Sequence, residues 1–329
     1  MTTKLGLGVT YDDTSLETSA KSAVRAIFGY GYGSPSGVYN SVNLVNNYGT
    51  IVGDVTGVGT ARSSPGATSY GGDKAIFGYG SPSSVVTAVT NLVSNLGFVS
   101  GDVTGVGTAR SGLAAAGYGG DKGIFGYGLS IPASAVYSLT NLVSNTGVVG
   151  TDVTGVGTAR YGLAAASYGG DKAIFGYGYS SSTFQQYSLT NLVSNTGVVG
   201  TDVTGVGTAR YGLAAASYGG DKAIFGYGFI GNVSPNYFAM TNLLSNIGVM
   251  ATDTSGVGTV RSGLAAASYG GDKAIFGYGQ LNGSGTGTAI TNLVSNTGVV
   301  STDTTGVGTL RYSLAATGYG GDKAIFGYG

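Results

Sequence analysis

Short apolar segments, rather than long amphipathic ones, dominate the pattern of hydrophobic and polar positions. In Lys172–Tyr177, Ala173 and Phe175 alternate with Ile174 and Gly176, so both faces of an extended strand would be mostly apolar. This pattern is typical of a strand that is packed on both sides. No stretch keeps an apolar period of 3.6 residues, so we predict no helix. The hydrophobicity pattern therefore predicts an all-β protein.

The apolar pattern recurs along the chain about every fifty residues. The segment IFGYG occurs seven times, starting at Ile27, Ile76, Ile124, Ile174, Ile224, Ile275 and Ile325. The segment TNLVSN, or a close variant, occurs six times, at Val42–Asn47, Thr90–Asn95, Thr140–Asn145, Thr190–Asn195, Thr241–Asn246 and Thr291–Asn296. A segment similar to TGVGTAR also occurs six times, ending at Arg62, Arg110, Arg160, Arg210, Arg261 and Arg311. A fixed period of this length indicates a repeat architecture.

Each repeat predicts four strands. The first is small and apolar, as in Gly162–Tyr168, and the Gly-rich segment Gly169–Asp171 forms a tight turn after it. The second is Lys172–Tyr177, the third is Leu189–Ser194, and the fourth surrounds Val198–Thr201. Four-stranded units bury both faces when they stack around an axis. The repeat therefore predicts a β-propeller with the first strand of each blade beside the axis, and a β-solenoid is the structural alternative.

The unequal number of repeated segments bears on the number of blades. Seven copies of the second strand favour seven blades, with six as the alternative. We interpret residues 1–329 as a single propeller domain, in which 1–25 are an irregular N-terminal closure segment and 26–329 carry the repeats. The last unit, Tyr312–Gly329, would lack its outer strands. We expect Lys4–Tyr11 (KLGLGVTY) to supply one of them and to close the ring.

The run Arg210–Gly228 (RYGLAAASYGGDKAIFGYG) resembles the kelch repeat: an Arg, a small apolar strand, a turn, and an apolar strand that ends in a glycine pair. Here the pair is Gly226 and Gly228, split by Tyr227, and the Trp usual in the fourth kelch strand is absent from the chain. The resemblance covers nearly all of residues 26–329 and implies a kelch-like β-propeller. The repeated segment GGDKAIFGYG also resembles repeats of tail and other virion proteins of bacteriophages, and this resemblance implies a virion or extracellular location.

The balance of charge limits the partners we expect. The chain has 15 basic and 15 acidic residues, and charged residues are only 9% of the total, against roughly 25% in ordinary domains. No basic stripe predicts nucleic-acid binding. No apolar run approaches the roughly 18 residues of a membrane helix, so we predict no membrane insertion. The N-terminus carries Lys4, Asp12 and Asp13 without an apolar core, so we expect no secretory signal there.

An Asp and an Arg keep a constant spacing in six repeats. The pairs are Asp54/Arg62, Asp102/Arg110, Asp152/Arg160, Asp202/Arg210, Asp253/Arg261 and Asp303/Arg311. We interpret them as structural charge pairs that tie loops between neighbouring blades, with a ring of ligand-binding charges as the alternative. One carboxylate in each loop is too few to predict a calcium site, so we predict no metal.

Catalytic residues are scarce in this composition. The sequence contains no His and no Cys, and its only Glu is Glu17. The common bases, thiol nucleophiles and soft metal ligands are therefore missing. Every repeated Asp has an equivalent in the next repeat, which leaves no singular acid–base pair of the glycosidase kind. The glycine motifs are not followed by a βαβ unit, so no nucleotide is expected either. We predict no catalytic residue, no cofactor and no enzyme.

The segment between the second and third strands varies while its surroundings repeat. These variable loops are Tyr32–Ser41, Ser81–Ala88, Leu129–Ser138, Tyr179–Ser188, Phe229–Ala239 and Gln280–Ala289. Exposed aromatic side chains beside Ser, Asn and Gln suit sugars or protein surfaces, although drift in unconstrained loops is the alternative. The candidate ligand-binding residues are Tyr32, Tyr39, Tyr137, Tyr179, Phe184, Tyr187, Phe229, Tyr237 and Phe238.

Two functions follow as hypotheses. The first is a non-enzymatic binding module on a virion, as part of a tail fibre or appendage, that recognises a cell-surface glycan or protein receptor. Its other partners would be virion or assembly proteins. The alternative is an architectural or decoration subunit of a virion or extracellular filament with no ligand of its own.

Overall fold

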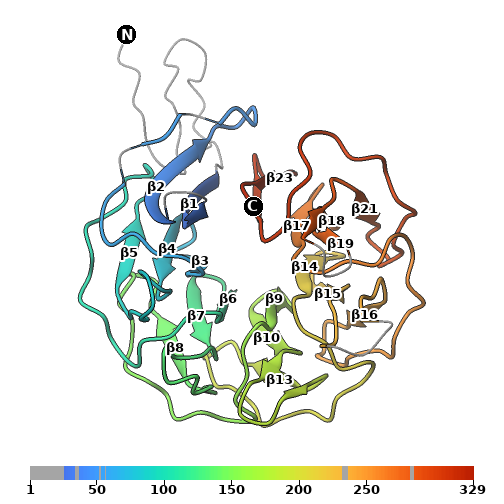
Figure 1. Ribbon diagram of the computed structural model, residues 1–329, viewed down its shortest axis with the longest axis horizontal. Helices are drawn as coiled ribbons and strands as arrows, with labels where there is room; N and C mark the ends of the chain where they lie inside the picture. The colour runs from blue at the N-terminus through green and yellow to red at the C-terminus, as the bar shows by residue number, and fades with distance from the viewer. Residues whose placement is uncertain (1–25, 34–36, 52, 56, 232–235, 282–284) are drawn as a thin grey trace.

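The computed structural model describes residues 26–33, 37–51, 53–55, 57–231, 236–281 and 285–329. In these ranges every regular element is a β-strand, and the sheets are arranged around a common centre (Figure 1). Five sheets have three antiparallel strands each, and the prediction of an all-β repeat fold is confirmed. The units have three regular strands where the sequence predicted four.

The strands fall into three repeated types and two small hairpins. The first strands are β3 (Gly66–Tyr70), β6 (Ala114–Tyr118), β9 (Ala164–Tyr168), β14 (Ala214–Tyr218), β17 (Ala265–Tyr269) and β22 (Ala315–Tyr319). The second strands are β1 (Ala26–Gly33), β4 (Lys74–Gly78), β7 (Lys122–Gly126), β10 (Lys172–Gly176), β15 (Lys222–Gly226), β18 (Lys273–Gly277) and β23 (Lys323–Gly327). The third strands are β2 (Gly37–Val45), β5 (Thr90–Val93), β8 (Thr140–Val143), β13 (Thr190–Val193), β16 (Thr241–Leu244) and β21 (Thr291–Val294). The variable loops add the hairpins β11 (Tyr179–Ser180) with β12 (Gln185–Gln186) and β19 (Gln280–Leu281) with β20 (Thr286–Gly287).

Small residues allow the first strands to crowd around the centre. Figure 1 shows β3, β6, β9, β14 and β17 on the inner side of their sheets. Their alanines leave room for neighbouring strands, and their serines join them: Ser167 Oγ donates to the Gly117 carbonyl at 2.9 Å, and Ser217 Oγ to the Ser167 carbonyl at 2.7 Å. The second strand lies between the first and third, with Ile174 opposite both Ala166 and Leu192. Its two faces are covered by the neighbouring sheets, because Ala173 and Phe175 pack against the preceding sheet and Ile174 packs against the next, which explains why both faces are apolar.

The predicted fourth strand is wrong as a regular element. Around Val198–Thr201 the chain makes isolated bridges to the third strand, Val193 with Val199 and Thr190 with Val203. One extra residue lies between these two bridges on the outer segment, so a continuous ladder cannot form. The Asn191 side-chain amide compensates by donating to the Gly200 carbonyl at 3.1 Å. The outer segment is therefore held partly by a side chain.

Neighbouring sheets pack through one repeated contact between Phe and Gly. A Cβ added to Gly126 would lie 2.6 Å from Cζ of Phe175 in the next sheet, so only glycine leaves space for the ring. The same contact joins Gly29 with Phe77, Gly78 with Phe125, Gly176 with Phe225, Gly226 with Phe276, Gly277 with Phe326 and Gly327 with Phe28. The last of these joins the sheet β22–β23 to the sheet β1–β2, at the opposite end of the chain.

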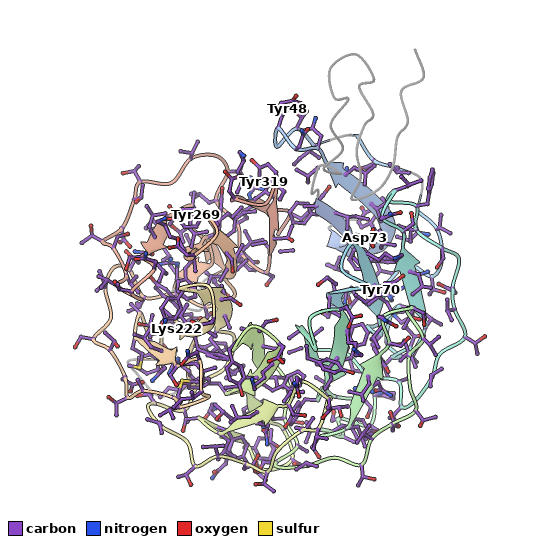
Figure 2. All side chains as sticks on the ribbon, turned by 180° about the vertical axis from the view of Figure 1, so that it is seen from behind. Tyr48, Tyr70, Asp73, Lys222, Tyr269 and Tyr319 are labelled. Atoms are coloured by element: carbon purple, nitrogen blue, oxygen red, sulfur yellow. The ribbon has the colours of Figure 1, made fainter. Side chains whose placement is uncertain are left out.

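The first and last sheets are incomplete within the described residues. The sheet β1–β2 has a second and a third strand, whereas β22–β23 has a first and a second. They meet where the Phe28 and Tyr328 rings lie 5.6 Å apart. Figure 2 shows Tyr48 and Tyr319 beside this junction. The predicted closure segment, residues 1–25 with Lys4–Tyr11, lies outside the described residues.

Candidate functional site

Arg160 shows what the repeated arginines do. Its side chain is fully buried, and each guanidinium nitrogen donates a hydrogen bond. Nε donates to the Tyr177 carbonyl at 2.7 Å, Nη1 to the Thr158 carbonyl at 2.9 Å, and Nη2 to Oδ1 of Asn191 at 2.6 Å. The guanidinium also lies 4.3 Å from the centre of the Tyr127 ring, in the preceding sheet. Arg160 therefore links two neighbouring sheets and offers no free charge to a ligand.

The charged partners come from successive repeats. The sequence spacing paired Asp152 with Arg160 and Asp202 with Arg210, but the structure does not bring these residues together as pairs. Each Asp follows the third strand of a sheet. It lies against the Arg that precedes the first strand of the same sheet and that ends the repeat before it. The observed ion pairs are Arg110–Asp152 at 3.8 Å, Arg160–Asp202 at 3.7 Å and Arg210–Asp253 at 3.7 Å. The charges thus connect successive repeats.

Hydrogen bonds keep these carboxylates ionised. Burial by itself would raise the pKa of Asp202, but hydrogen bonds from Thr158 and Asn191 and the charge of Arg160 hold that pKa below its usual value. The Thr158 backbone amide donates to Asp202 at 2.9 Å and its hydroxyl at 2.7 Å. Because the carboxylate is satisfied inside the protein, it is an unsuitable ligand for a metal. No cluster of His, Cys, Asp or Glu that could hold a metal ion occurs in the described ranges.

Three buried tyrosines predict loss of stability at high pH. Burial raises the pKa of Tyr79, Tyr127 and Tyr177 from 10.0 to about 12. Between pH 10 and pH 12 the folded protein keeps these protons, whereas the unfolded chain loses them. The contribution of these tyrosines to the free energy of unfolding is therefore fully present below pH 10 and is lost as the pH rises towards 12. Each tyrosine contributes at most about 3 kcal/mol to this loss. Urea unfolding midpoints measured from pH 8 to pH 12 should fall only above pH 10, and a flat profile would contradict the burial.

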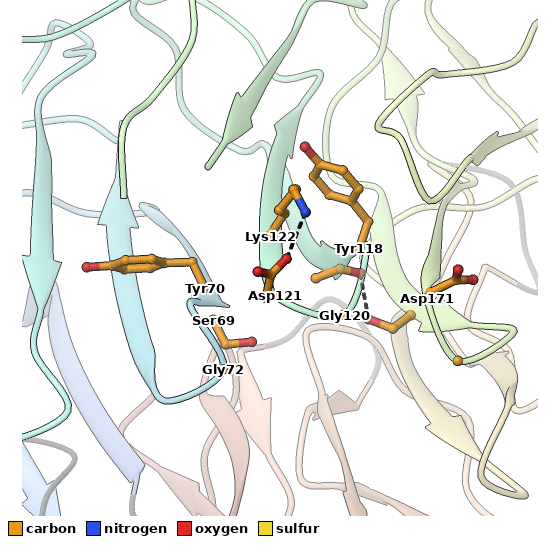
Figure 3. Close-up of a pocket in the computed structure, with 11 residues that line it drawn as sticks. Ser69, Tyr70, Gly72, Tyr118, Gly120, Asp121, Lys122 and Asp171 are labelled. Atoms are coloured by element: carbon orange, nitrogen blue, oxygen red, sulfur yellow. Dashed lines mark hydrogen bonds and ion pairs between the residues drawn. The ribbon is translucent and has the colours of Figure 1, made fainter. Parts of the chain in front are cut away.

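The Gly-Gly-Asp turns lie at the other end of the sheets from the Arg–Asp pairs. Figure 3 shows a pocket there that is lined by three successive turns, with the Asp121–Lys122 ion pair at 2.8 Å. The Lys122 hydrogen bond lowers the pKa of Asp121, and Asn145 adds a second hydrogen bond at 3.0 Å. The same Asp–Lys pair recurs in six sheets, at Asp73, Asp121, Asp171, Asp221, Asp272 and Asp322. This pocket therefore has the repeated geometry of a turn and no singular chemistry.

The candidate loop residues differ widely in exposure. Phe184 and Tyr32 are 78% and 73% exposed, and Tyr39 is 39% exposed. Tyr237 is buried, which removes it from direct contact with a large ligand. The remaining candidates are partly buried: Tyr137, Tyr179, Tyr187, Phe229 and Phe238.

Five aromatic rings form a continuous row on the variable-loop face, which we call the aromatic row: Tyr161, Tyr179, Tyr211, Phe229 and Tyr237. Successive ring centroids lie 5.6, 5.1, 4.0 and 5.5 Å apart. Backbone bridges between Tyr161 and Tyr179 and between Tyr211 and Phe229 hold the row in place. Burial and the neighbouring tyrosines raise the pKa of Tyr211 to about 12, so its phenol stays neutral near pH 7. The row breaks the repeat, because the equivalent bridges elsewhere join Ser63 to Ser81 and Ser262 to Gln280.

Sequence reasoning found Tyr179, Phe229 and Tyr237 but missed Tyr161 and Tyr211. Both follow the repeated Arg and were therefore treated as part of the constant framework. A signal was present: Tyr follows Arg160, Arg210 and Arg311, whereas Ser follows Arg62, Arg110 and Arg261, and only Tyr312 of these three tyrosines lies outside the aromatic row. Variation inside a repeated segment thus marks the site as clearly as variation in the loops.

Comparisons with known proteins bear on the fold. No protein-family model matches the sequence, and no curated protein matches it. Among solved structures, the chain is similar to a fungal alcohol oxidase of the AA5 family in complex with copper, with a TM-score of 0.60 and 14% identity. The match covers 91% of this chain and 65% of the oxidase chain, so this chain spans less than two thirds of the oxidase. At this identity the likeness concerns the fold alone, and it supports a β-propeller of kelch-like repeats. No helix in the described ranges is long and apolar enough to span a membrane.

Proposed function

We propose that this chain is a non-enzymatic binding module that recognises a cell-surface glycan or protein through its variable-loop face. The observation that carries the proposal is the aromatic row, which interrupts an otherwise repeated framework over two neighbouring sheets. A ligand rarely has the symmetry of a repeat protein, so a binding site is expected where the repeat is broken. Partly exposed aromatic side chains held in place by backbone bridges suit recognition.

Contacts between adjacent loops support a pre-arranged surface. Ser181 Oγ donates to the Ser134 carbonyl of the neighbouring loop at 3.1 Å, and the Thr183 and Tyr187 hydroxyls are hydrogen-bonded at 3.0 Å. Phe184, at the tip between β11 and β12, has a φ of 57°, which is uncommon for a residue other than glycine. A large apolar side chain held in water on such a tip suits contact with a partner.

The location on a virion or extracellular appendage is part of the same proposal. Its support is the resemblance of the repeats to those of bacteriophage tail and virion proteins. Other virion or assembly proteins would be the second class of partner. Many copies on one particle would strengthen weak contacts through avidity.

Removing the exposed ring at the loop tip tests the binding function. Phe184→Ala is expected to weaken attachment to cells about tenfold or more, as at an interface hot spot, and to leave the thermal unfolding temperature unchanged. Val198→Ala is the matched control, because Val198 is 66% exposed on the hairpin near the Gly-Gly-Asp turns, at the other end of the sheet. Replacing Tyr179, Phe184 and Tyr187 together by Ala should abolish attachment. Attachment is measured as the binding of labelled protein to cells. Unchanged attachment of the triple variant would contradict the proposal.

An architectural role is the second candidate, and one observation favours it. Exposed apolar side chains recur at the outer hairpins of successive sheets, where Phe98, Val148, Val198, Val249 and Val299 are 60–67% exposed. A repeated apolar rim suits packing against other subunits of a filament or virion. In that case the variable loops would have no ligand of their own.

We also propose that the ring has seven blades and that the N-terminal segment completes it. The Gly327–Phe28 contact, which repeats the contact between all other neighbouring sheets, supports a closed ring. In the described residues, the outer edge of β23 has no third strand, and Lys4–Tyr11 is the segment proposed to pair there. Pairing would remove an open strand edge, which could otherwise pair with another chain and cause aggregation.

A further inference from the structure

The variable loops themselves carry no charge, and the Asp side chains at the same end of the sheets, such as Asp152, Asp202 and Asp253, are 24–28% exposed and paired with buried Arg. None of the six loops contains Asp, Glu, Lys or Arg. The arginines of the first five repeats lie beneath this face with fully buried side chains. The six Asp–Lys pairs stand at the other ends of the strands, in the Gly-Gly-Asp turns. A ligand on the aromatic row therefore meets hydroxyl, amide and aromatic groups.

Hydroxyl and amide side chains border the aromatic row closely. Ser182 and Thr183 are exposed in the β11–β12 hairpin, where the Ser182 hydroxyl lies 2.9 Å from the hydroxyl of the buried Ser180. Gln185 and Gln186 follow in the same hairpin. Each of these groups can both donate and accept hydrogen bonds. Sugar hydroxyls have the same dual capacity, whereas carboxylates, sulfates and ammonium groups need a partner of opposite charge.

We infer, on the basis of the binding function proposed above, that the ligand is an uncharged carbohydrate chain lying along the aromatic row. The apolar C–H faces of its sugar rings would pack against Tyr161, Tyr179, Tyr211 and Phe229. Its hydroxyls would exchange hydrogen bonds with the Ser, Thr and Gln side chains of the β11–β12 hairpin. The row extends over neighbouring sheets, so it suits a chain of several sugars better than a single sugar.

The absence of charge in the variable loops favours a neutral carbohydrate over an acidic glycan or a protein partner. An acidic glycan would lose hydration of its charges against a surface without compensating cations, which is unfavourable. A protein partner ordinarily brings charged groups to the rim of its interface, and these would find no complementary charge in the loops. A neutral polysaccharide exchanges only hydrogen bonds and apolar contacts, so its binding should be nearly independent of salt.

Binding to immobilised polysaccharides and to treated cells tests the inference with the full chain. The neutral probes are dextran, mannan and galactomannan, and the acidic probes are alginate and hyaluronate, at about 0.05 M and about 0.5 M NaCl. We expect attachment to cells to be lost after periodate oxidation of their glycans and kept after protease treatment. We expect neutral polysaccharide binding to change less than about twofold with salt. Tyr179→Ala should weaken it about tenfold, and Val148→Ala on the opposite rim should not.

The other outcomes separate this inference from the proposed function. Attachment that is lost after protease treatment and survives periodate identifies a protein receptor. Binding restricted to the acidic probes and abolished by salt identifies a charged glycan. Either result overturns the neutral-glycan inference and leaves the binding function standing. Absence of attachment to untreated cells overturns both.

Discussion

Replacing Arg160 with Ala is expected to lower the free energy of unfolding by about 3–5 kcal/mol, the range found when one partner of a buried charged network is removed. Three hydrogen bonds, the ion pair to Asp202 and the contact with the Tyr127 ring are lost together. The Asn191 side chain and the Tyr177 carbonyl would remain buried without their donor. Urea unfolding followed by circular dichroism measures the loss.

Arg311 provides the matched control, because it holds the same position in the last repeat with a different environment. Its side chain is partly exposed, its Nε donates to the Thr309 carbonyl at 3.3 Å, and the Tyr278 ring lies 5.2 Å away. No third strand of the sheet β22–β23 supplies an Asn to it in the described residues. Arg311→Ala should cost less than about 1 kcal/mol. Equal losses for Arg160→Ala and Arg311→Ala would contradict the structural role of the buried arginines.

The second large effect concerns the glycines between sheets. Gly126→Ala should destabilise the protein by about 1–3 kcal/mol, because the new methyl group overlaps the buried Phe175 ring. Gly327→Ala should cost a similar amount, since a Cβ there would lie 2.9 Å from Cε2 of Phe28. Gly101→Ala is the control, because Gly101 is exposed and nothing lies within 4 Å of an added Cβ. If Gly327→Ala behaves like Gly101→Ala, the first and last sheets do not pack as neighbouring blades.

The repeat allowed much of the fold to be predicted from the sequence. The apolar pattern of Lys172–Tyr177 predicted a strand packed on both sides, and β10 packs against the preceding and the following sheet. The outer segment around Val198–Thr201 was predicted as the fourth strand of the repeat. Spacing could not reveal the extra residue between its bridges or the Asn191 amide that replaces the ladder there. Register depends on the partner strand, which a single segment does not show.

Sequence distance misled the interpretation of the charged residues and of part of the site. Asp152 and Arg160 are near in sequence, but Asp152 forms its ion pair with Arg110 of the preceding repeat. Stacking of repeats creates such contacts, and they appear only when the sheets are placed around an axis. The same stacking brings Tyr161 and Tyr211 into the aromatic row. Residues that belong to the constant framework can therefore complete a site that variable loops began.

Imaging the assembled particle with its bound receptor tests whether the variable-loop face binds the receptor. We predict that the variable loops Tyr179–Ser188 and Phe229–Ala239 face outward and contact the receptor, while the Gly-Gly-Asp face or the outer rim contacts the rest of the assembly. Loops buried against neighbouring subunits, with receptor contacts elsewhere or absent, would contradict the binding function and favour the architectural role.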